Sequence, residues 1–354
     1  MPTPLYDSVK ELPLRVDGAV LEDRFVTVAA GWERHTTLIR LRGGGLEGVG
    51  EDVVYEGDDQ AAFQQAGPPP GLAGEHTLDG FSQLLDSLEP LGAPVKRETS
   101  HQYRRWAFES AALDLALRQA GLSLAEALGL PVRPVRFVVS MGLGDPPSAE
   151  RVRQMLTHDP GMRFKLDATE HWDDALVSEL AATGAVDCID LKAFYTGTVV
   201  DNPPNPELYR RVCEGFPQAV IEDAMICDET RDILMAHRDR LAFDAPVHSV
   251  DDVLGFGFPL RVLNIKPSRF GSLRNLFATY EHCRDNGIAA YGGGQFELAE
   301  GRGHIQYLAS LFHPETANDV APAEYNLGLP VDELPRSPLA PAADAVGFRW
   351  GSVS

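Results

Sequence analysis

The sequence predicts an α/β protein, a (β/α)8-type (TIM-like) barrel with an N-terminal α+β capping domain. From about residue 134, short apolar strands alternate with helix-like stretches, and the first 130 residues do not share this alternation. One βα unit for every 22 to 32 residues is typical of a (β/α)8 barrel, and the predicted strand ends have this spacing, at Ser140, Lys165, Asp190, Glu222, Asp244 and Lys266. A chain of 354 residues also exceeds one ordinary hydrophobic core, which stops growing near roughly 250–300 residues.

The capping domain is predicted from strands that precede helices. Strand-like segments lie at 24–30 and 36–42. A Pro/Gly-rich loop at 67–74 separates them from a helix predicted over 103–119, where apolar residues recur at helical spacing. Gly121 is a stop signal for that helix. Strands followed by helices favour an α+β domain.

The barrel is predicted from its repeated units. Seven strands are expected, at 135–140, 162–166, 186–191, 219–221, 241–243, 262–265 and 288–291, with a weak eighth at 319–321. Helices are expected between them, at 148–155, 172–182, 206–213, 231–238 and 273–283. An open doubly wound sheet is the competing architecture, but the Gly-rich fingerprint after its first strand is missing.

These patterns divide the chain into three parts. We predict a capping domain at 1–130, a barrel at 131–322, and a C-terminal segment at 323–354 that packs back on the capping domain.

Composition and charge exclude several function classes. The chain has 31 Lys+Arg and 52 Asp+Glu, a formal net charge of −21, which repels nucleic acids and anionic membranes. No apolar run approaches 18 residues, and the start has no signal-peptide pattern. We therefore expect a cytoplasmic protein that binds neither nucleic acid nor membranes. The four cysteines show no CxxC spacing and are expected to be buried free thiols.

Lysine is scarce, and its placement is informative. The chain has only five lysines, and three of them, Lys165, Lys192 and Lys266, stand at predicted strand ends. A single charge at a strand end is usually solvated or ion-paired. Chance, however, would place roughly a third of one lysine there, because strand ends make up a small share of a barrel. Since catalytic side chains in barrels come from the C-terminal ends of strands, these lysines are candidate catalytic residues.

Three carboxylates from consecutive strands accompany the lysines. Asp190, Glu222 and Asp244 would converge at the barrel mouth, where they would repel one another unless a cation neutralised them. Such oxygen ligands suit Mg²⁺, with Mn²⁺ as the alternative. A lysine beside a dication has a lowered pKa and can accept a proton, which an arginine cannot do. A dication and a lysine base are the machinery for abstracting a proton α to a carboxylate to give an enediolate.

At this point the sequence resembles the enolase superfamily, in particular the muconate-lactonizing-enzyme and o-succinylbenzoate-synthase-like branch. The resemblance covers nearly the whole chain. It rests on Gly48-Val-Gly-Glu51, on the helix with its Ala111-Ala-Leu-Asp114 core, and on Gly293-Gly-Gln-Phe-Glu297 with Gly301-Arg302. It implies a capping domain joined to a modified barrel, Asp190, Glu222 and Asp244 as metal ligands, and Lys266 as the sixth-strand acid/base group.

The second and third strands depart from the family pattern. The family carries Lys-x-Lys and Asp-x-Asn, whereas this chain has Lys165-Leu-Asp167 and Asp190-Leu-Lys192. Three interpretations stay open. Lys192 takes over the missing lysine's role; or Asp167 is a base or fourth metal-side carboxylate that is salt-bridged to Lys192; or Asp167 is a ligand in place of Asp190.

The expected activity is Mg²⁺-dependent abstraction of the α-proton of a small-molecule carboxylate, followed by elimination, cycloisomerisation or epimerisation. The chain would be a lyase or isomerase, and homo-oligomerisation is compatible with the resemblance. Candidate substrate-binding residues are Gln295, Glu297, Tyr55 and Ser268. The alternatives are a Schiff-base lysine aldolase and a non-catalytic enolase-like barrel.

Overall fold

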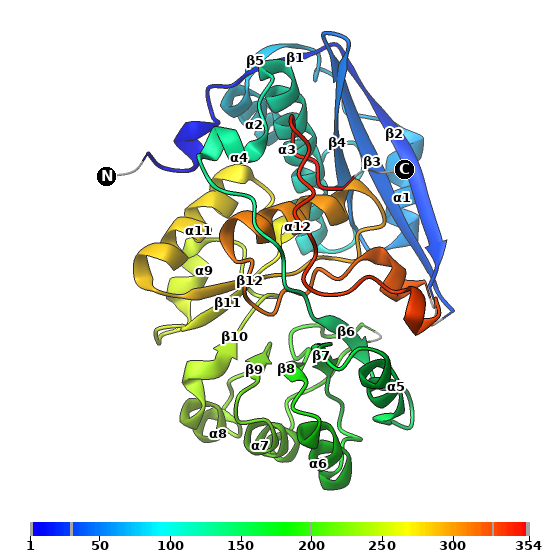
Figure 1. The fold of residues 1–354 in the computed structure, drawn as a ribbon. Helices are drawn as coiled ribbons and strands as arrows, with labels where there is room; N and C mark the ends of the chain where they lie inside the picture. The colour runs from blue at the N-terminus through cyan, green and yellow to red at the C-terminus, as the bar shows by residue number, and fades with distance from the viewer. Residues whose placement is uncertain (1–2, 29–30, 199, 328, 352–354) are drawn as a thin grey trace.

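The computed structural model describes residues 3–28, 31–198, 200–327 and 329–351 (Figure 1). In Figure 1 the N-terminal elements, blue to teal, lie above the helices and strands of the barrel, green to orange. Within the described residues, no helix has both the length and the apolar character needed to cross a membrane.

The capping domain contains two small antiparallel sheets and several helices. The larger sheet has the order β2-β3-β4, with β2 at Gly18–Thr27, β3 at Glu33–Gly43 and β4 at Leu46–Asp52. The smaller one pairs β1 (Pro13–Val16) with β5 (Gly74–Thr77). The accompanying helices are η1 (Tyr6–Ser8), α1 (Gly57–Ala66), α2 (Leu78–Ser87), α3 (Glu98–Ala120) and α4 (Leu124–Leu128).

The predicted strand 24–30 begins six residues after the observed one, because β2 starts at Gly18 and pairs with β3 from that residue. Residues 29–30 lie outside the described residues. The middle of β3 is buried on both faces, since α1 and α3 both contact it. The predicted strand 36–42 falls within the longer β3, and this two-sided burial removes the polar alternation from which the limits of β3 would be read.

The glycines of the Gly48-Val-Gly-Glu51 motif let β4 approach α3. A Cβ built on Gly48 would stand 2.2 Å from the Ala111 carbonyl oxygen, and one on Gly50 would stand 1.9 Å from that of Ala107. Both distances are far below van der Waals contact, so a side chain at either position would push the strand off the helix.

Parallel strands form the barrel wall. Five of them have the order β10-β9-β8-β7-β6: β6 (Val139–Gly142), β7 (Phe164–Asp167), β8 (Val186–Asp190), β9 (Val220–Glu222) and β10 (Leu241–Ala242). A second pair is β11 (Val262–Ile265) with β12 (Ala289–Gly292). The Asn264 N–H donates to the Phe243 carbonyl at 3.3 Å and links the two groups.

The eighth stave is a single extended segment. Asn318 and Asp319 make isolated parallel bridges to Phe137 and Gly293, next to β6 and β12. The predicted strand 135–140 is shorter than expected, because Val135 pairs with Leu339 of the C-terminal segment instead of with β7.

Helices cover the outside of the barrel, and those after β6 to β9 are seen in green at the bottom of Figure 1. They are α5 (Glu150–His158), α6 (Asp174–Ala182), α7 (Pro206–Gly215), α8 (Arg231–Ala236), η2 (Arg238–Arg240), α9 (Val250–Gly255), α11 (Leu273–Asn286) and α12 (Glu300–Phe312). The short α10 (Pro267–Phe270) instead follows β11 at the C-terminal end of the strands and contacts α3. The predicted helix 231–238 ends earlier, at Ala236, and a separate 3-10 turn follows it. Two more such turns, η3 (Ala323–Asn326) and η4 (Val331–Glu333), lie in the C-terminal segment.

Asp114 ties three parts of the chain together. Its carboxylate accepts N–H bonds from Val49 on β4 (3.0 Å) and from Phe348 in the C-terminal segment (2.8 Å), and it pairs with Arg349 at 2.7 Å. The described part of the C-terminal segment therefore contacts α3 and β4, as the red trace beside α3 in Figure 1 also shows. The three-part division of the chain, with boundaries at 130 and 322, stays a prediction.

Glu51 connects the capping domain to the barrel. Its carboxylate accepts N–H bonds from Leu298, Ala299 and Gly301 at 2.6–3.0 Å, at the start of α12. These are donors that the first turn of a helix cannot satisfy internally, and the partial positive charge there favours a carboxylate. The glutamate of the motif thus fixes the segment that follows β12.

Candidate active site

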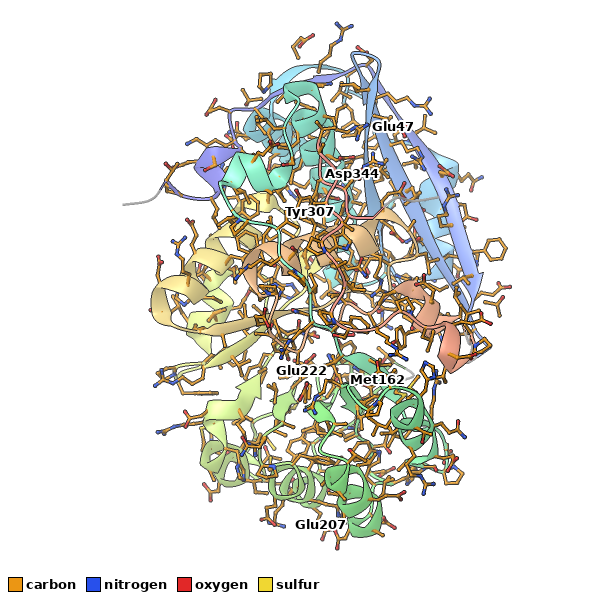
Figure 2. The ribbon with its side chains drawn as sticks, viewed as in Figure 1. Glu47, Met162, Glu207, Glu222, Tyr307 and Asp344 are labelled. Carbon is orange, nitrogen blue, oxygen red and sulfur yellow. The ribbon has the colours of Figure 1, made fainter. Side chains whose placement is uncertain are left out.

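Lys165 lies at the centre of the barrel mouth, the end of the barrel formed by the C-terminal ends of the strands. Its Nζ is 2.5 Å from Glu222 Oε1, 3.1 Å from Asp190 Oδ2 and 3.4 Å from Asp319 Oδ2. Only 1% of the Lys165 side chain is exposed. Figure 2 shows Glu222 inside the barrel, surrounded by other side chains. The structure thus brings Lys165, Asp190 and Glu222 together, as the strand-end pattern predicts.

Lys192 and Asp167 form an ion pair beside this centre. Lys192 Nζ is 3.1 Å from Asp167 Oδ1 and 2.5 Å from Asp190 Oδ2. Lys192 is 17% exposed and Asp167 29%, so both are closer to solvent than Lys165. Burial would lower the pKa of Lys192, but Asp167 and Asp190 outweigh it and hold the pKa well above its ordinary value.

Lys266 and Asp244 form the opposite side of the mouth. Lys266 Nζ makes a short ion pair with Asp244 Oδ2, and Arg269 Nη2 is 2.9 Å from Asp244 Oδ1. The Tyr195 hydroxyl donates to Asp244 Oδ1 at 3.3 Å and accepts from Arg269 Nη2 at 2.8 Å. Burial acts to raise the pKa of Asp244, but Lys266 and Arg269 hold it well below its usual range.

Glu222 is held by donors on both carboxylate oxygens. Oε1 accepts from Lys165 and from Asn264 Nδ2 at 3.0 Å. Oε2 accepts from the Tyr291 hydroxyl and from Cys188 Sγ at 3.4 Å. Burial raises the pKa of Glu222 to about 7, and Lys165 only partly offsets this rise.

Asp223 is a buried carboxylate without a cation. Among the described residues, no Lys, Arg or His side chain lies within 4.0 Å of it, and its Oδ1 accepts the Asp244 N–H at 2.9 Å. Burial, followed by repulsion from Asp244, Asp190 and Glu222, raises its pKa well above the ordinary value. Its position requires a compensating positive charge or a bound proton.

We call the charged side chains at the barrel mouth the mouth cluster: Lys165, Lys192, Lys266 and Arg269 as cations, and Asp167, Asp190, Glu222, Asp223, Asp244 and Asp319 as carboxylates. Six carboxylates against four cations leave a formal excess of two negative charges, the charge of one dication. Oxygens of Asp190, Glu222 and Asp223 lie within 4.8 Å of one another. A buried all-oxygen donor set with an excess of negative charge fits Mg²⁺.

Backbone strain is concentrated at the same end of the barrel. In the described ranges, the non-glycine residues with positive φ are Lys192 (50°), Asp223 (52°) and Phe296 (60°). Lys192 lies two residues after the end of β8, Asp223 directly follows β9, and Phe296 lies in the segment after β12. Such conformations are costly for residues with a Cβ and cluster at functional sites.

Two of the predicted substrate-binding residues, Gln295 and Tyr55, lie on the side of the mouth where Arg269 is found. Gln295 is buried, and its amide, oriented to satisfy both ends, donates to the Tyr55 hydroxyl (3.2 Å) and accepts from Arg269 (3.1 Å). Tyr55 is half-exposed under the guanidinium of Arg34. Gln295 and Tyr55 thus reach the mouth cluster through Arg269.

Glu297 and Ser268 are buried beside the mouth. Glu297 accepts the Gln295 N–H at 2.8 Å. The carboxylate that accepts N–H bonds at the start of α12 is that of Glu51, not that of Glu297. The Ser268 hydroxyl has no hydrogen-bond partner in the described structure. Gly293 makes room here, because a Cβ on it would stand 2.8 Å from Lys266 Cε.

Sequence reasoning missed Tyr195, Asn264, Asp223 and Asp319 as site residues. The signal for Asp223 is its position, because it directly follows the predicted ligand Glu222 at a strand end. Asn264 is two residues before Lys266 on β11 and therefore shares its face. Tyr195 lies on the loop after β8, and Asp319 lies on the irregular eighth stave, so no periodicity marks either of them.

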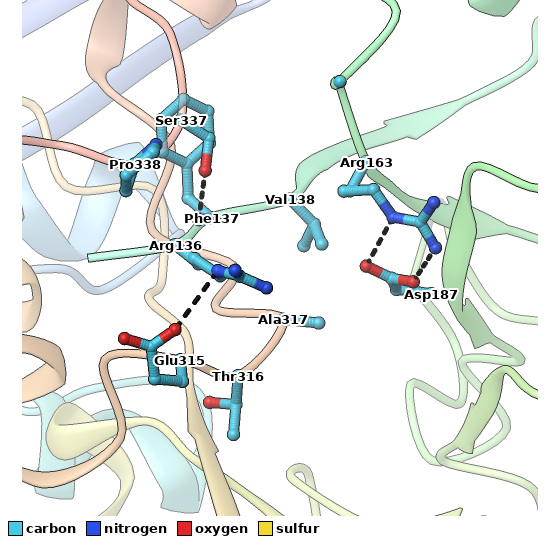
Figure 3. Close-up of a pocket in the computed structure, with 11 residues that line it drawn as sticks. Arg136, Phe137, Val138, Arg163, Asp187, Glu315, Thr316, Ala317, Ser337 and Pro338 are labelled. Atoms are coloured by element: carbon cyan, nitrogen blue, oxygen red, sulfur yellow. Dashed lines mark hydrogen bonds and ion pairs between the residues drawn. The ribbon is translucent and has the colours of Figure 1, made fainter. Parts of the chain in front are cut away.

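A cavity of about 510 Å³ lies at the other end of the barrel (Figure 3). Its charged residues form one-to-one pairs, Arg163 with Asp187 and Arg136 with Glu315 at 3.2 Å. Charges paired in this way at the N-terminal face of a barrel indicate a structural role. The uncompensated charge is at the mouth.

Known proteins share the fold and part of the sequence. The o-succinylbenzoate synthase of Geobacillus stearothermophilus is 24% identical over 264 residues, 71% of this chain and 68% of that protein. An N-succinylamino acid racemase of Thermus thermophilus is 26% identical over 330 residues, 86% of this chain and 83% of that protein. The crystal structure of an enolase superfamily member from Listeria innocua has a TM-score of 0.67 at 18% identity, covering 89% and 88% of the two chains.

The fold and these relatives place the protein in the enolase superfamily, with an N-terminal domain and a C-terminal α/β barrel. The chain belongs to the family described as a domain of unknown function (DUF8230), whose N-terminal domain model matches residues 7–127 and whose C-terminal domain model matches residues 131–327. The predicted fold class and the predicted superfamily are therefore confirmed. The relatives are enzymes with different reactions, so the superfamily does not fix the reaction of this chain.

Proposed function

We propose that this protein is a Mg²⁺-dependent enzyme, a lyase or isomerase, that abstracts the α-proton of a small-molecule carboxylate to give an enediolate. Elimination, cycloisomerisation or epimerisation would follow. The observation that carries the proposal is the mouth cluster, where lysines on two sides flank a buried group of carboxylates and the carboxylates formally outnumber the cations by two. A cytoplasmic location and homo-oligomerisation stay predictions.

Asp190 and Glu222 are proposed as metal ligands. The third is Asp244, as the family resemblance implies, or Asp223, which lies with Asp190 and Glu222 inside the 4.8 Å group. When bound there, Mg²⁺ would neutralise the negative charge that develops on the substrate carboxylate. Comparing Asp223→Asn with Asp244→Asn in a magnesium titration identifies the third ligand.

Lys266 is proposed as the proton-abstracting base on one side. Burial acts to lower its pKa, but Asp244 holds the pKa above the ordinary value. Lys266 therefore becomes a base only when another cation takes up the charge of Asp244. Arg269 and Tyr195 hold Asp244 from its other oxygen and orient it toward Lys266.

Lys192 is proposed as the acid/base group on the other side, with Asp167 as its counter-ion. The ion pair between them is the contact that the second interpretation expects, and Lys192 also reaches the proposed ligand Asp190 at 2.5 Å, which places a lysine beside the metal-ligand candidates from the segment after β8 instead of from β7. Lys192 is also favoured over Lys165 because it is more exposed, so a substrate reaches it more easily.

The experiment is solvent deuterium exchange into the α-position of an N-succinylamino acid, followed by proton NMR with Mg²⁺ present. We expect Lys266→Ala to reduce exchange by about 10²–10⁴-fold, the usual contribution of a general base. Lys10→Ala is the control, because Lys10 is a surface residue that pairs with Asp7. Undiminished exchange in Lys266→Ala would remove Lys266 from the role of base.

A Schiff-base aldolase is less well supported. Its nucleophile must be a neutral amine, whereas Lys165, Lys192 and Lys266 each pair with carboxylates that raise their pKa. Borohydride trapping with a keto acid tests it, since only an aldolase would be covalently labelled.

A further inference from the structure

Lys165 stands where a cation belongs. Its ammonium contacts carboxylates from β8, β9 and the eighth stave, namely Asp190, Glu222 and Asp319, at 2.5–3.4 Å. Two of these three carboxylates, Asp190 and Glu222, belong to the group whose oxygens lie within 4.8 Å of one another. A nitrogen that bridges two carboxylates of a candidate metal group has the surroundings of a bound cation.

We propose that Lys165 is a built-in counter-ion that holds the cation position of the metal-free protein and must give up Asp190 and Glu222 when Mg²⁺ binds. The inference rests on the proposed function, because it takes the mouth cluster to be a magnesium site.

The occupancy of Glu222 supports this exchange. A carboxylate oxygen has two lone pairs, and both oxygens of Glu222 already accept two donors each. An incoming cation therefore has to displace one of the four donors. Lys165 is the only charged one among them, so its ammonium would also repel a dication at close range.

The structure also offers a place for the displaced ammonium. Asp319 is 3.4 Å from Lys165 Nζ, is 19% exposed and lies outside the 4.8 Å group. In the metal-loaded protein, Lys165 would keep Asp319 as its partner and leave Asp190 and Glu222 to the metal. The same lysine would then stabilise the empty site and weaken its affinity for metal.

Calorimetric titration with MgCl₂ alone tests the proposal. We expect Lys165→Met to bind Mg²⁺ at least about tenfold more tightly than the native protein, because the competing charge is gone. The same variant should unfold at a lower temperature in EDTA, since Asp190 and Glu222 lose their shared counter-ion. It should regain that stability with Mg²⁺.

Two control variants make the test specific. Lys192→Met removes the same charge from the mouth cluster, but of the 4.8 Å group Lys192 contacts Asp190 alone, so we expect a smaller gain in affinity. Lys10→Met should change nothing. Equal gains in Lys165→Met and Lys192→Met would show a general charge effect and overturn the specific role of Lys165.

A second measurement uses the unaltered protein. With five lysines in the chain, acetylation by acetic anhydride can be assigned residue by residue by mass spectrometry. We expect acetylation of Lys165 to rise on addition of MgCl₂, while that of the surface lysines Lys10 and Lys96 stays constant. Unchanged or reduced labelling of Lys165 at saturating Mg²⁺ would overturn the proposal.

The two proposals fail differently. If the native protein binds Mg²⁺ and Lys165→Met binds it no more tightly, the counter-ion role is wrong and the proposed function stands. If neither protein binds Mg²⁺ at millimolar concentration, the magnesium site itself is wrong and both proposals fail. Binding by Lys165→Met alone would support both.

Discussion

Two fully buried aspartates, Asp114 in the capping domain and Asp223 at the barrel mouth, show how differently the two regions treat charge. Each is 0% exposed, and each accepts two backbone N–H bonds. Asp114 also pairs with Arg349 at 2.7 Å, whereas no Lys, Arg or His of the described chain lies within 4.0 Å of Asp223. Asp114, paired and fully bonded, serves the fold, whereas Asp223 has no cation within 4.0 Å and lies in a group with the carboxylates of Asp190 and Glu222, which indicates a ligand.

The same contrast separates the two regions as wholes. At the junction of the capping domain and the barrel, Glu51 receives three backbone N–H bonds, and within the capping domain Arg104 pairs with Asp52 at 2.9 Å. The mouth cluster instead has a formal excess of two carboxylates over cations, and all three strained non-glycine residues of the described chain lie at that end. Unbalanced charge and backbone strain are tolerated where they prepare a binding site.

The largest expected effect is that of Asp114→Asn. An asparagine presents an NH₂ group to either Val49 N–H or Phe348 N–H, which are both donors, and leaves Arg349 without a charged partner. We expect the free energy of unfolding to fall by about 3 kcal/mol. Urea denaturation measures it. Lys96→Met, which breaks an exposed pair with Asp58, is the control and should leave stability unchanged.

Asp223→Asn should have the opposite sign. The asparagine oxygen can still accept the Asp244 N–H, and a buried negative charge without a cation is removed. We expect the free energy of unfolding in EDTA to rise by about 1–2 kcal/mol. If the free energy of unfolding instead fell as much as in Asp114→Asn, the two aspartates would have the same structural role. That result would contradict the contrast between the two regions.

The third prediction concerns pH in the absence of metal. The pKa of Glu222 is raised to about 7 by burial, so the folded protein keeps a proton that the unfolded chain releases near its ordinary pKa of about 4.5. The stability linked to Glu222 is therefore present below pH 4.5 and is lost as the pH rises to 7. Relative to Glu222→Gln, the native protein should lose about 1–3 kcal/mol across this window.

The difference in stability between the native protein and Glu222→Gln excludes the contributions of other titrating groups. His304 and His313 are buried with lowered pKa values of about 3 and about 4, so they change stability in the opposite direction over part of this range. Both are present in the two proteins and cancel in the difference. A difference that stays constant from pH 4.5 to 7 in EDTA would contradict the raised pKa of Glu222.

The architecture and the chemical type of the site are predictable from the order of the residues alone. Strand ends spaced 22 to 32 residues apart place charged residues at one end of a barrel, because parallel strands present their C-terminal ends together. The scarcity of lysine identified Lys165, Lys192 and Lys266, and the structure brings all three to the barrel mouth.

The pairing of these residues, in contrast, depends on the folded arrangement of the strands. Sequence spacing gives the strand on which a side chain lies, but not which partners it meets across the barrel. For this reason the sequence did not predict that Lys165 contacts Asp319 or that the Tyr291 hydroxyl donates to Glu222. It also did not predict that Asp223 has no cation within 4.0 Å in the described chain. The C-terminal contact at Asp114 has the same origin, because it joins residues more than two hundred positions apart in the chain. Pairing of charges depends on distances through space, and the fold alone sets those distances.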